Sequence, residues 1–242
     1  MYAYYKSGRG DESRERNRQS SIELGQERAN PTNWNPDKII LGERKRAFES
    51  GLGRLPDTGL CVLDIGGRIQ PFRHLLGERV STYIAVDRQI EGLTDVVATG
   101  EKLPFLDGQF DLVHCTQMLS YVADPAAVIR EAQRVLKPGG SMFLTAPAWF
   151  PEHHDECWRF LPGGLKVLLT GWRDIEILPE GNSAVGALRT IAVVISDKCQ
   201  GRVMAPVSRR FLIPFLNMIA ARMVTRNTNS ALVANYSVWA TK

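Results

Sequence analysis

The sequence is short of the features that mark several classes of protein. Its four cysteines are widely spaced and form no Cys-x-x-Cys pair: Cys61, Cys115, Cys157 and Cys199. This spacing predicts neither a disulfide framework nor a zinc site, and it favours reduced thiols. No apolar run reaches the ~20 residues of a membrane-spanning helix, and residues 1–5 lack the charged-then-apolar order of a signal peptide. We therefore expect a cytoplasmic protein with no bound metal.

Acidic residues are absent after Asp197, although seven lysines and arginines follow it. The chain has 30 basic and 26 acidic residues in all, so the body before this tail is slightly acidic. An acidic body argues against nucleic acid as a partner. The apolar run 211–219 lies between arginines, which suits a membrane interface, a helix covering the sheet or a dimer contact. We expect either a peripheral membrane contact or a homodimer through residues 209–226.

Short apolar runs alternate with helical patterns in the middle of the chain. Such alternation predicts an α/β fold with a parallel sheet and helices on both faces. The strongest helix signal is Asp124-Pro125, where the proline suits a first helical turn. The expected strands lie at residues 60–65, 83–86, 112–115, 142–145, 175–178 and 236–240, and other helices at 37–51 and 165–169.

The two ends of the chain differ from this middle part. Residues 1–36 are polar and rich in mixed charge, which predicts a partly disordered N-terminal arm. The domain proper is expected to span residues 37–242. Residues 182–230 are long for a connection, so we expect a helical insertion with helices near 187–195 and 210–224.

A glycine pair ends the first expected strand, and an acid ends the second. Gly66 and Gly67 would allow a ligand close to the backbone, and the Asp87 carboxylate suits the two hydroxyls of a ribose. Both a dinucleotide and S-adenosylmethionine fit this much. A dinucleotide needs Gly-x-Gly-x-x-Gly for its pyrophosphate, and the loop at residues 66–71 lacks the second and third of these glycines. The loop therefore favours S-adenosylmethionine.

Several short motifs occur in a fixed order around this loop. They are Asp64-Ile65-Gly66-Gly67, the acid Asp87, Leu103-Pro104-Phe105, Phe110-Asp111-Leu112-Val113 and Leu136-Lys137-Pro138-Gly139-Gly140. With this set the chain resembles a class I S-adenosylmethionine-dependent methyltransferase of the type 11 group. The resemblance implies a Rossmann-like, doubly wound sheet of seven strands, mostly parallel with an antiparallel last strand.

The resemblance also assigns roles within the cofactor site. It implies that Asp64, Gly66 and Gly67 hold the methionine end and that Asp87 holds the ribose. Thr99, Gly100 and Glu101 are expected to flank the adenine, and Thr116 to belong to the same site. The chain departs from the family at Thr99, where an acid is usual, at Arg68, where a further glycine is frequent, and at Tyr121, where histidine is frequent.

The segment after the fifth strand offers candidates for the methyl acceptor site. His153, His154 and Asp155 stand where substrate reaches the methyl group in this fold, and an oxygen acceptor of high pKa needs a base. His114, within a strand, is interpreted as an interior histidine. The proposed substrate contacts are Arg73, Trp158 and Arg159, because arginine and aromatic side chains suit a hydroxylated or phosphorylated acceptor.

These residues resemble the branch of the family linked to sugar, polysaccharide and natural-product biosynthesis. We therefore expect a small-molecule methyltransferase that O-methylates a sugar, a glycan precursor or a secondary metabolite. C-methylation of a quinone-like or polyketide ring is one alternative, and it would tolerate loss of every rim histidine. A non-catalytic cofactor-binding partner subunit is the other, with Arg68 and Thr99 in its favour.

Overall fold

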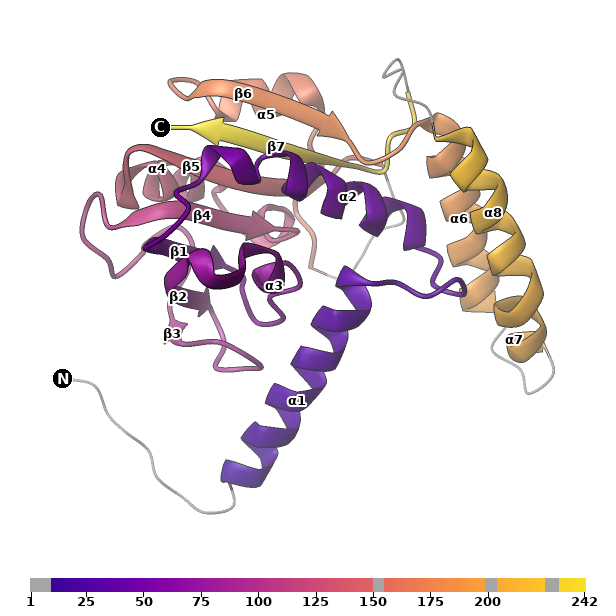
Figure 1. The fold of residues 1–242 in the computed structure, drawn as a ribbon. Helices are drawn as coiled ribbons and strands as arrows, with labels where there is room; N and C mark the ends of the chain where they lie inside the picture. The colour runs from indigo at the N-terminus through magenta and orange to yellow at the C-terminus, as the bar shows by residue number, and fades with distance from the viewer. Residues whose placement is uncertain (1–9, 150–154, 199–203, 225–230) are drawn as a thin grey trace.

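The computed structural model describes residues 10–149, 155–198, 204–224 and 231–242. Within these residues the centre of the fold is a seven-stranded sheet (Figure 1). Its strands are β1 (Leu60–Ile65), β2 (Val80–Asp87), β3 (Val96–Val97), β4 (Phe110–Thr116), β5 (Leu136–Pro147), β6 (Arg173–Pro179) and β7 (Asn235–Thr241).

The strands lie in the order β3-β2-β1-β4-β5-β7-β6. The pairs from β3 to β5 are all parallel, while β7 pairs antiparallel with both β5 and β6. The last strand is thus inserted antiparallel between two strands that share one direction. This arrangement confirms the predicted fold class. It also brings the carboxyl ends of β1, β2 and β4 to one edge, where ligands bind in open sheets of this type.

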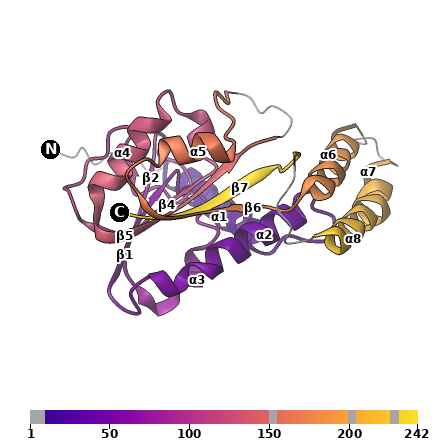
Figure 2. The ribbon, with the colours of Figure 1, turned by 90° about the horizontal axis from the view of Figure 1, so that it is seen from above.

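Helices cover both faces of the sheet, with α2 and α3 on one side and α4 and α5 on the other (Figure 2). Asp124 begins α4 as expected, since its side chain accepts a hydrogen bond of 3.0 Å from the Ala127 amide. Such a cap is worth about 1 kcal/mol. The helices of the domain are α2 (Lys38–Ser50), α3 (Arg73–Leu76), α4 (Pro125–Val135) and α5 (Pro162–Leu168).

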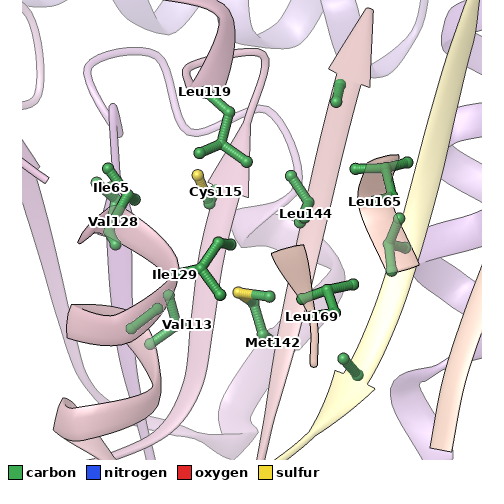
Figure 3. Close-up of a cluster of buried hydrophobic side chains, with 14 of the residues drawn as sticks. Ile65, Val113, Cys115, Leu119, Val128, Ile129, Met142, Leu144, Leu165 and Leu169 are labelled. Atoms are coloured by element: carbon green, nitrogen blue, oxygen red, sulfur yellow. The ribbon is translucent and has the colours of Figure 1, made fainter. Parts of the chain in front are cut away.

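Each face of the sheet has its own apolar core. Under α4 and α5, Val113, Cys115, Met142 and Leu144 of the sheet meet Ile129 and its neighbours (Figure 3). On the opposite face an aromatic cluster forms, in which Phe48 of α2 contacts Phe72, Phe143 and Trp239 with ring centroids 5.0–5.7 Å apart. Alternate residues of the buried strands supply the two cores, which explains their near-continuous apolar sequences.

Residues 10–29, expected within a partly disordered arm, form the helix α1 (Gly10–Ala29). Residues 13–20 are exposed, but Gly25 and Ala29 are buried against the domain. A Cβ at position 25 would lie 2.1 Å from the Ile69 carbonyl oxygen, so α1 contacts the glycine loop at backbone distance. A segment expected to be partly disordered thus forms a helix that is exposed over residues 13–20 and packs against the domain near its end.

The helices of the insertion between β6 and β7 lie to one side of the sheet, where α6 and α8 run side by side (Figures 1 and 2). The insertion contains α6 (Ser183–Lys198), α7 (Met204–Val207), a π-helical turn (Ser208–Leu212) and α8 (Ile213–Met223). Ile40 of α2 packs with Val185 of α6 and Ala220 of α8 in a third apolar cluster. None of the described helices is long and apolar enough to cross a bilayer.

Candidate active site

A cavity of about 820 Å³ opens at the carboxyl ends of β1, β2 and β4. This volume lies within the range of ~300–1,000 Å³ that is usual for small-molecule sites. The cavity gathers all the predicted cofactor residues in its wall: Asp64, Gly66, Gly67, Asp87, Thr99, Gly100, Glu101 and Thr116. These residues come from segments more than fifty positions apart, and the sheet edge brings them together.

The glycine loop is shaped by close packing against its own strand ends. Gly66 has φ +80°, a conformation that favours glycine, and its amide donates to the Val86 carbonyl at 2.7 Å. A Cβ on Gly67 would lie 2.7 Å from Cγ of Asp64 and 2.8 Å from its backbone oxygen. A side chain on either glycine would therefore disturb the loop that floors the cavity.

Asp64 is a buried carboxylate, with 1% of its surface exposed. One of its oxygens accepts a hydrogen bond of 2.6 Å from the Tyr83 hydroxyl, and the other lies 3.2 Å from Nδ1 of His114. Burial, followed by the charge of Asp64, raises the pKa of Tyr83 well above its ordinary value. Tyr83 and His114 thus fix the carboxylate orientation beneath the glycine loop, a contact that the loop sequence alone did not indicate.

His114 is an interior histidine, as the sequence analysis interpreted it. Its ring contacts Phe48, Phe72 and Phe143. Nδ1 faces Asp64, whereas Nε2 is buried and has no hydrogen-bond partner among the described residues. His114 is not among the lining residues of the cavity, so it supports Asp64 from behind rather than facing a ligand.

The far end of the cavity has the features expected for a ribose and an adenine. Asp87 ends β2, and its Oδ1 accepts a 3.2 Å hydrogen bond from the Gln89 amide. Gly100 is buried, and a Cβ there would lie 2.8 Å from Cε of Met118. Glu101 accepts a 3.3 Å hydrogen bond from the Ala123 amide, which ties the two loops of this wall together.

Backbone strain gathers around the cavity. Four non-glycine residues of the described chain have positive φ, and three of them, Gln70, Gln117 and Asp155, line the cavity. Gln117 is held in this conformation by Thr145, whose hydroxyl oxygen accepts bonds of 3.2 and 3.1 Å from its amide and side chain. Strained conformations collect at functional sites. Neither glutamine belongs to a sequence motif that predicted a place in the site.

The predicted acceptor residues are only partly at the cavity. Asp155 lines it, whereas His153 and His154 lie outside the described residues. Trp158 donates to the Val122 carbonyl at 2.9 Å, and Arg159 forms a 2.7 Å ion pair with Glu156. Val122 and Glu156 are lining residues, but Trp158 and Arg159 are not. These two side chains therefore contact residues of the cavity wall without lining the cavity themselves.

Arg73, the third predicted substrate contact, lies behind the glycine loop. Its guanidinium is 4.7 Å from the ring centroid of Tyr83 and donates to Gln70 at 2.9 Å. Gln70 lines the cavity and Arg73 does not. In this structure Arg73 supports the loop and the tyrosine that binds Asp64.

Three further arginines that carried no sequence signal belong to a basic part of the cavity wall. Arg28 of α1, Arg44 of α2 and Arg189 of α6 all line the cavity. Arg44 forms a buried ion pair with Glu180 through two contacts of 2.9 and 2.8 Å, and Arg189 contacts Asp37 at 2.5 Å. Burial lowers the pKa of Arg28 and of Arg189. The helices that supply this wall have no motif, so only packing could show that they meet.

Comparison with known proteins adds a family and a fold to this geometry. Residues 63–144 match the family described as "Methyltransferase domain". A "Ubiquinone biosynthesis O-methyltransferase" of Pseudomonas aeruginosa is 53% identical over 156 residues, which are 62% of this chain and 60% of that protein. The chain thus matches about three fifths of the length of this curated relative.

Two solved structures share the fold. A SAM-dependent methyltransferase from Archaeoglobus fulgidus has a TM-score of 0.53 at 18% identity, covering 91% of this chain and 99% of its own. Phosphoethanolamine N-methyltransferase 2 of Haemonchus contortus, solved with S-adenosyl-L-methionine, has a TM-score of 0.52 at 14% identity. The alignment covers 90% of this chain and 60% of that protein. The shared fold confirms the predicted fold class, and the match over residues 63–144 agrees with the expected S-adenosylmethionine-dependent methyltransferase domain. They do not confirm the sugar and natural-product branch.

Proposed function

We propose that this chain is an S-adenosylmethionine-dependent O-methyltransferase whose acceptor is a hydroxyl group on a small aromatic ring. The observation that carries the proposal is one cavity whose lining contains both the predicted cofactor residues and the arginines Arg28, Arg44 and Arg189. A volume of about 820 Å³ is large enough for a nucleoside cofactor together with a small acceptor. The similarity to a protein named ubiquinone biosynthesis O-methyltransferase supports O-methylation, and we take an aromatic hydroxyl as the acceptor that suits such a name.

The residues of the cavity fit the cofactor in shape and charge. Gly67 and Gly100 leave space that a Cβ would fill, and Asp87 offers a carboxylate at the end of β2. Asp64, Asp87 and Glu101 together give this part of the cavity a negative charge, which suits a sulfonium cation. When bound, S-adenosylmethionine supplies a methyl group that is already activated for displacement.

The chain's own task is to hold the acceptor oxygen in line with the methyl group and to take its proton. Of the lining acids on the acceptor side, Asp155 has positive φ (67°) and Glu156 is engaged by Arg159. We assign Asp155 as the proton acceptor, and His153 and His154, which precede it in the sequence, stay predicted bases. A phenol has a pKa of about 10 and loses its proton more readily than an alcohol, so a weak base suffices for it.

A sugar hydroxyl is the second candidate acceptor. Trp149 and Trp158 on either side of residues 150–154 each have 43% of their surface exposed. Exposed aromatic rings in this segment suit a flat or apolar ring face of either kind. The aromatic acceptor is preferred because the curated relative supports it.

The first test is isothermal titration of the purified chain with S-adenosylhomocysteine. Micromolar binding is expected, and no detectable binding would contradict the proposal and favour a non-catalytic partner subunit. The second test offers labelled cofactor with a catechol and with a sugar of similar size. Label transfer to the catechol oxygen supports the proposal, whereas a carbon-bound methyl group in the product would instead establish the C-methyltransferase alternative.

A further inference from the structure

Arg28 differs from the other arginines of the cavity. It is half-buried on the domain side of α1 and lines the cavity, yet among the described residues it has no hydrogen bond and no ion pair. Arg44 is paired with Glu180, and Arg68 is paired with Glu91 at 3.2 Å. A cation held away from water without a partner is unfavourable, so such a side chain is expected to meet a negative group when a ligand is present.

The acid whose charge acts on Arg28 is already engaged by another arginine. Burial and the charge of Arg44 lower the pKa of Arg28, while Asp37 raises it. Asp37, however, is already in contact with Arg189 at 2.5 Å. The backbone of α1 contacts the glycine loop at Gly25, which places Arg28, about one helical turn further along, in the wall of the cavity.

We propose that Arg28 binds a carboxylate of a ligand in this cavity, which makes α1 a part of the site. This inference rests on the proposed function, because it needs a ligand in that cavity. Two ligands can supply the group, namely the amino-acid end of the cofactor and an acid substituent on the acceptor. Guanidinium and carboxylate groups form paired, charge-assisted hydrogen bonds. The matched methyltransferase family begins at residue 63, so it assigns nothing to α1.

The test compares Arg28→Gln, which removes the charge, with Arg28→Lys, which keeps it. Arg18→Gln is the matched control, because Arg18 is an exposed arginine on the same helix. The binding probes are two pairs that differ in a carboxylate. S-adenosylhomocysteine carries the amino-acid group that 5′-methylthioadenosine lacks, and 3,4-dihydroxybenzoate carries the carboxylate that catechol lacks. The acceptor pair is titrated in the presence of saturating S-adenosylhomocysteine.

If the cofactor supplies the group, Arg28→Gln weakens S-adenosylhomocysteine binding roughly tenfold to a hundredfold and leaves 5′-methylthioadenosine unchanged. If the acceptor supplies it, the same loss falls on 3,4-dihydroxybenzoate and spares catechol. Arg28→Lys is expected to retain part of the affinity in either case. If the wild-type protein binds the probes and Arg28→Gln binds all four with unchanged affinity, the inference about Arg28 is overturned and the proposed function is not. A wild-type protein that binds neither nucleoside contradicts the proposed function itself.

A second inference rests on the outer face of the helical insertion. The inner face of α8 is buried through Ile213 and Ala220, and the Asn217 side chain donates to the carbonyls of Asn33 and Asn35 at 2.8 and 2.9 Å. Large apolar side chains of α8 and of the turn before it are nevertheless 40–66% exposed: Phe211, Leu212, Phe215, Met218 and Met223.

Positive charge surrounds this apolar face. Arg209, Arg210 and Arg222 are all exposed, and the chain has no acidic residue after Asp197. We infer that this face lies on the surface of an anionic membrane, with the phenylalanines in the interface and the arginines at the headgroups. Charge decides against a symmetric dimer through the same face, because a two-fold axis would bring these arginines towards their own copies.

Co-sedimentation with vesicles tests this surface. The protein is expected to bind vesicles that contain phosphatidylglycerol and to stay in solution with phosphatidylcholine alone. The double change Phe211→Ser and Phe215→Ser should remove binding without altering thermal stability. Val167→Ser is the matched control, since Val167 is 74% exposed on α5. Failure to bind anionic vesicles, or a concentration-dependent dimer that the phenylalanine changes dissociate, overturns the inference.

Discussion

Replacement of Asp87 tests the cofactor site at a residue whose side chain contributes little to holding the fold together. Asp87 is half-buried at the end of β2, and within the described residues its side chain accepts a 3.2 Å hydrogen bond from the Gln89 amide. Its remaining lone pairs are available to a ligand. Asp87→Asn and Asp87→Ala should therefore lower affinity for S-adenosylhomocysteine while leaving the fold intact.

The size of the effect follows from the hydrogen bonds that are lost. A bond to a charged group contributes about 1.5–3 kcal/mol, and Asp87 can accept two from a ribose. Partial exposure favours the lower value, so removal of both bonds in Asp87→Ala costs about 3 kcal/mol. Since 1.4 kcal/mol corresponds to tenfold, affinity should fall roughly a hundredfold. Asp87→Asn keeps one neutral acceptor and should lose about 2 kcal/mol, or roughly thirtyfold.

Isothermal titration with S-adenosylhomocysteine measures these losses, and thermal unfolding checks the fold. Glu91→Gln is a suitable control, because Glu91 is an exposed acid close by in the chain that pairs with Arg68 instead. An affinity within threefold of wild type in Asp87→Ala would refute the ribose assignment. An equal loss in Glu91→Gln would show that general charge, and not a specific contact, is responsible.

Three further changes probe the supports of the site. Gly25→Ala should weaken cofactor binding by titration, because the new Cβ would meet the Ile69 oxygen and move α1 off the glycine loop. Tyr83→Phe should lower the free energy of unfolding by about 1.5–3 kcal/mol, since it removes the hydroxyl bonded to Asp64. The raised pKa of Tyr83 means that its contribution is complete below pH 10 and is lost as pH rises towards the folded-state pKa, so the variant should lack this alkaline loss in stability. Glu180→Gln should destabilise the fold by about 3–5 kcal/mol in denaturant unfolding, because it leaves a buried arginine without its charge partner.

These predictions have matched controls and contrary outcomes. Gly42→Ala changes a helical glycine with no atom within 4 Å of the added Cβ, so it should be neutral or stabilising. Cofactor binding that is equally strong in Gly25→Ala would show that α1 does not position the loop. Alkaline unfolding identical in wild type and Tyr83→Phe would contradict the ionisation argument. A Glu180→Gln variant as stable as wild type would show that the buried ion pair is not needed.

The central sheet and the cofactor side of the cavity were predictable because both follow from local sequence. Leu60–Ile65 is apolar, ends in glycine and forms β1 as predicted. Asp124-Pro125 begins α4 as predicted. In a parallel sheet, residues that follow successive strands must meet at one edge, so Gly66 and Asp87 could be paired without knowledge of side-chain packing.

The acceptor side could be predicted only in part. Asp155 was expected and lines the cavity, while Arg73 was expected at the substrate and instead packs on Tyr83. The position of Arg73 after the glycine loop suggested a place at the rim of the cavity, but its side chain points towards the Tyr83 ring. The directions of such side chains depend on neighbours that the local sequence does not specify.

By itself, the sequence determined the order of the strands and helices, the glycine loop and the kind of cofactor. These depend on apolar periodicity, on backbone freedom at glycine and on short motifs, all of which act over a few neighbouring residues. Only the tertiary structure placed Arg28, Arg44 and Arg189 around one cavity and gave α1 a place on the glycine loop. Such contacts join residues far apart in the chain, and their geometry arises from the packing of whole helices rather than from any local pattern.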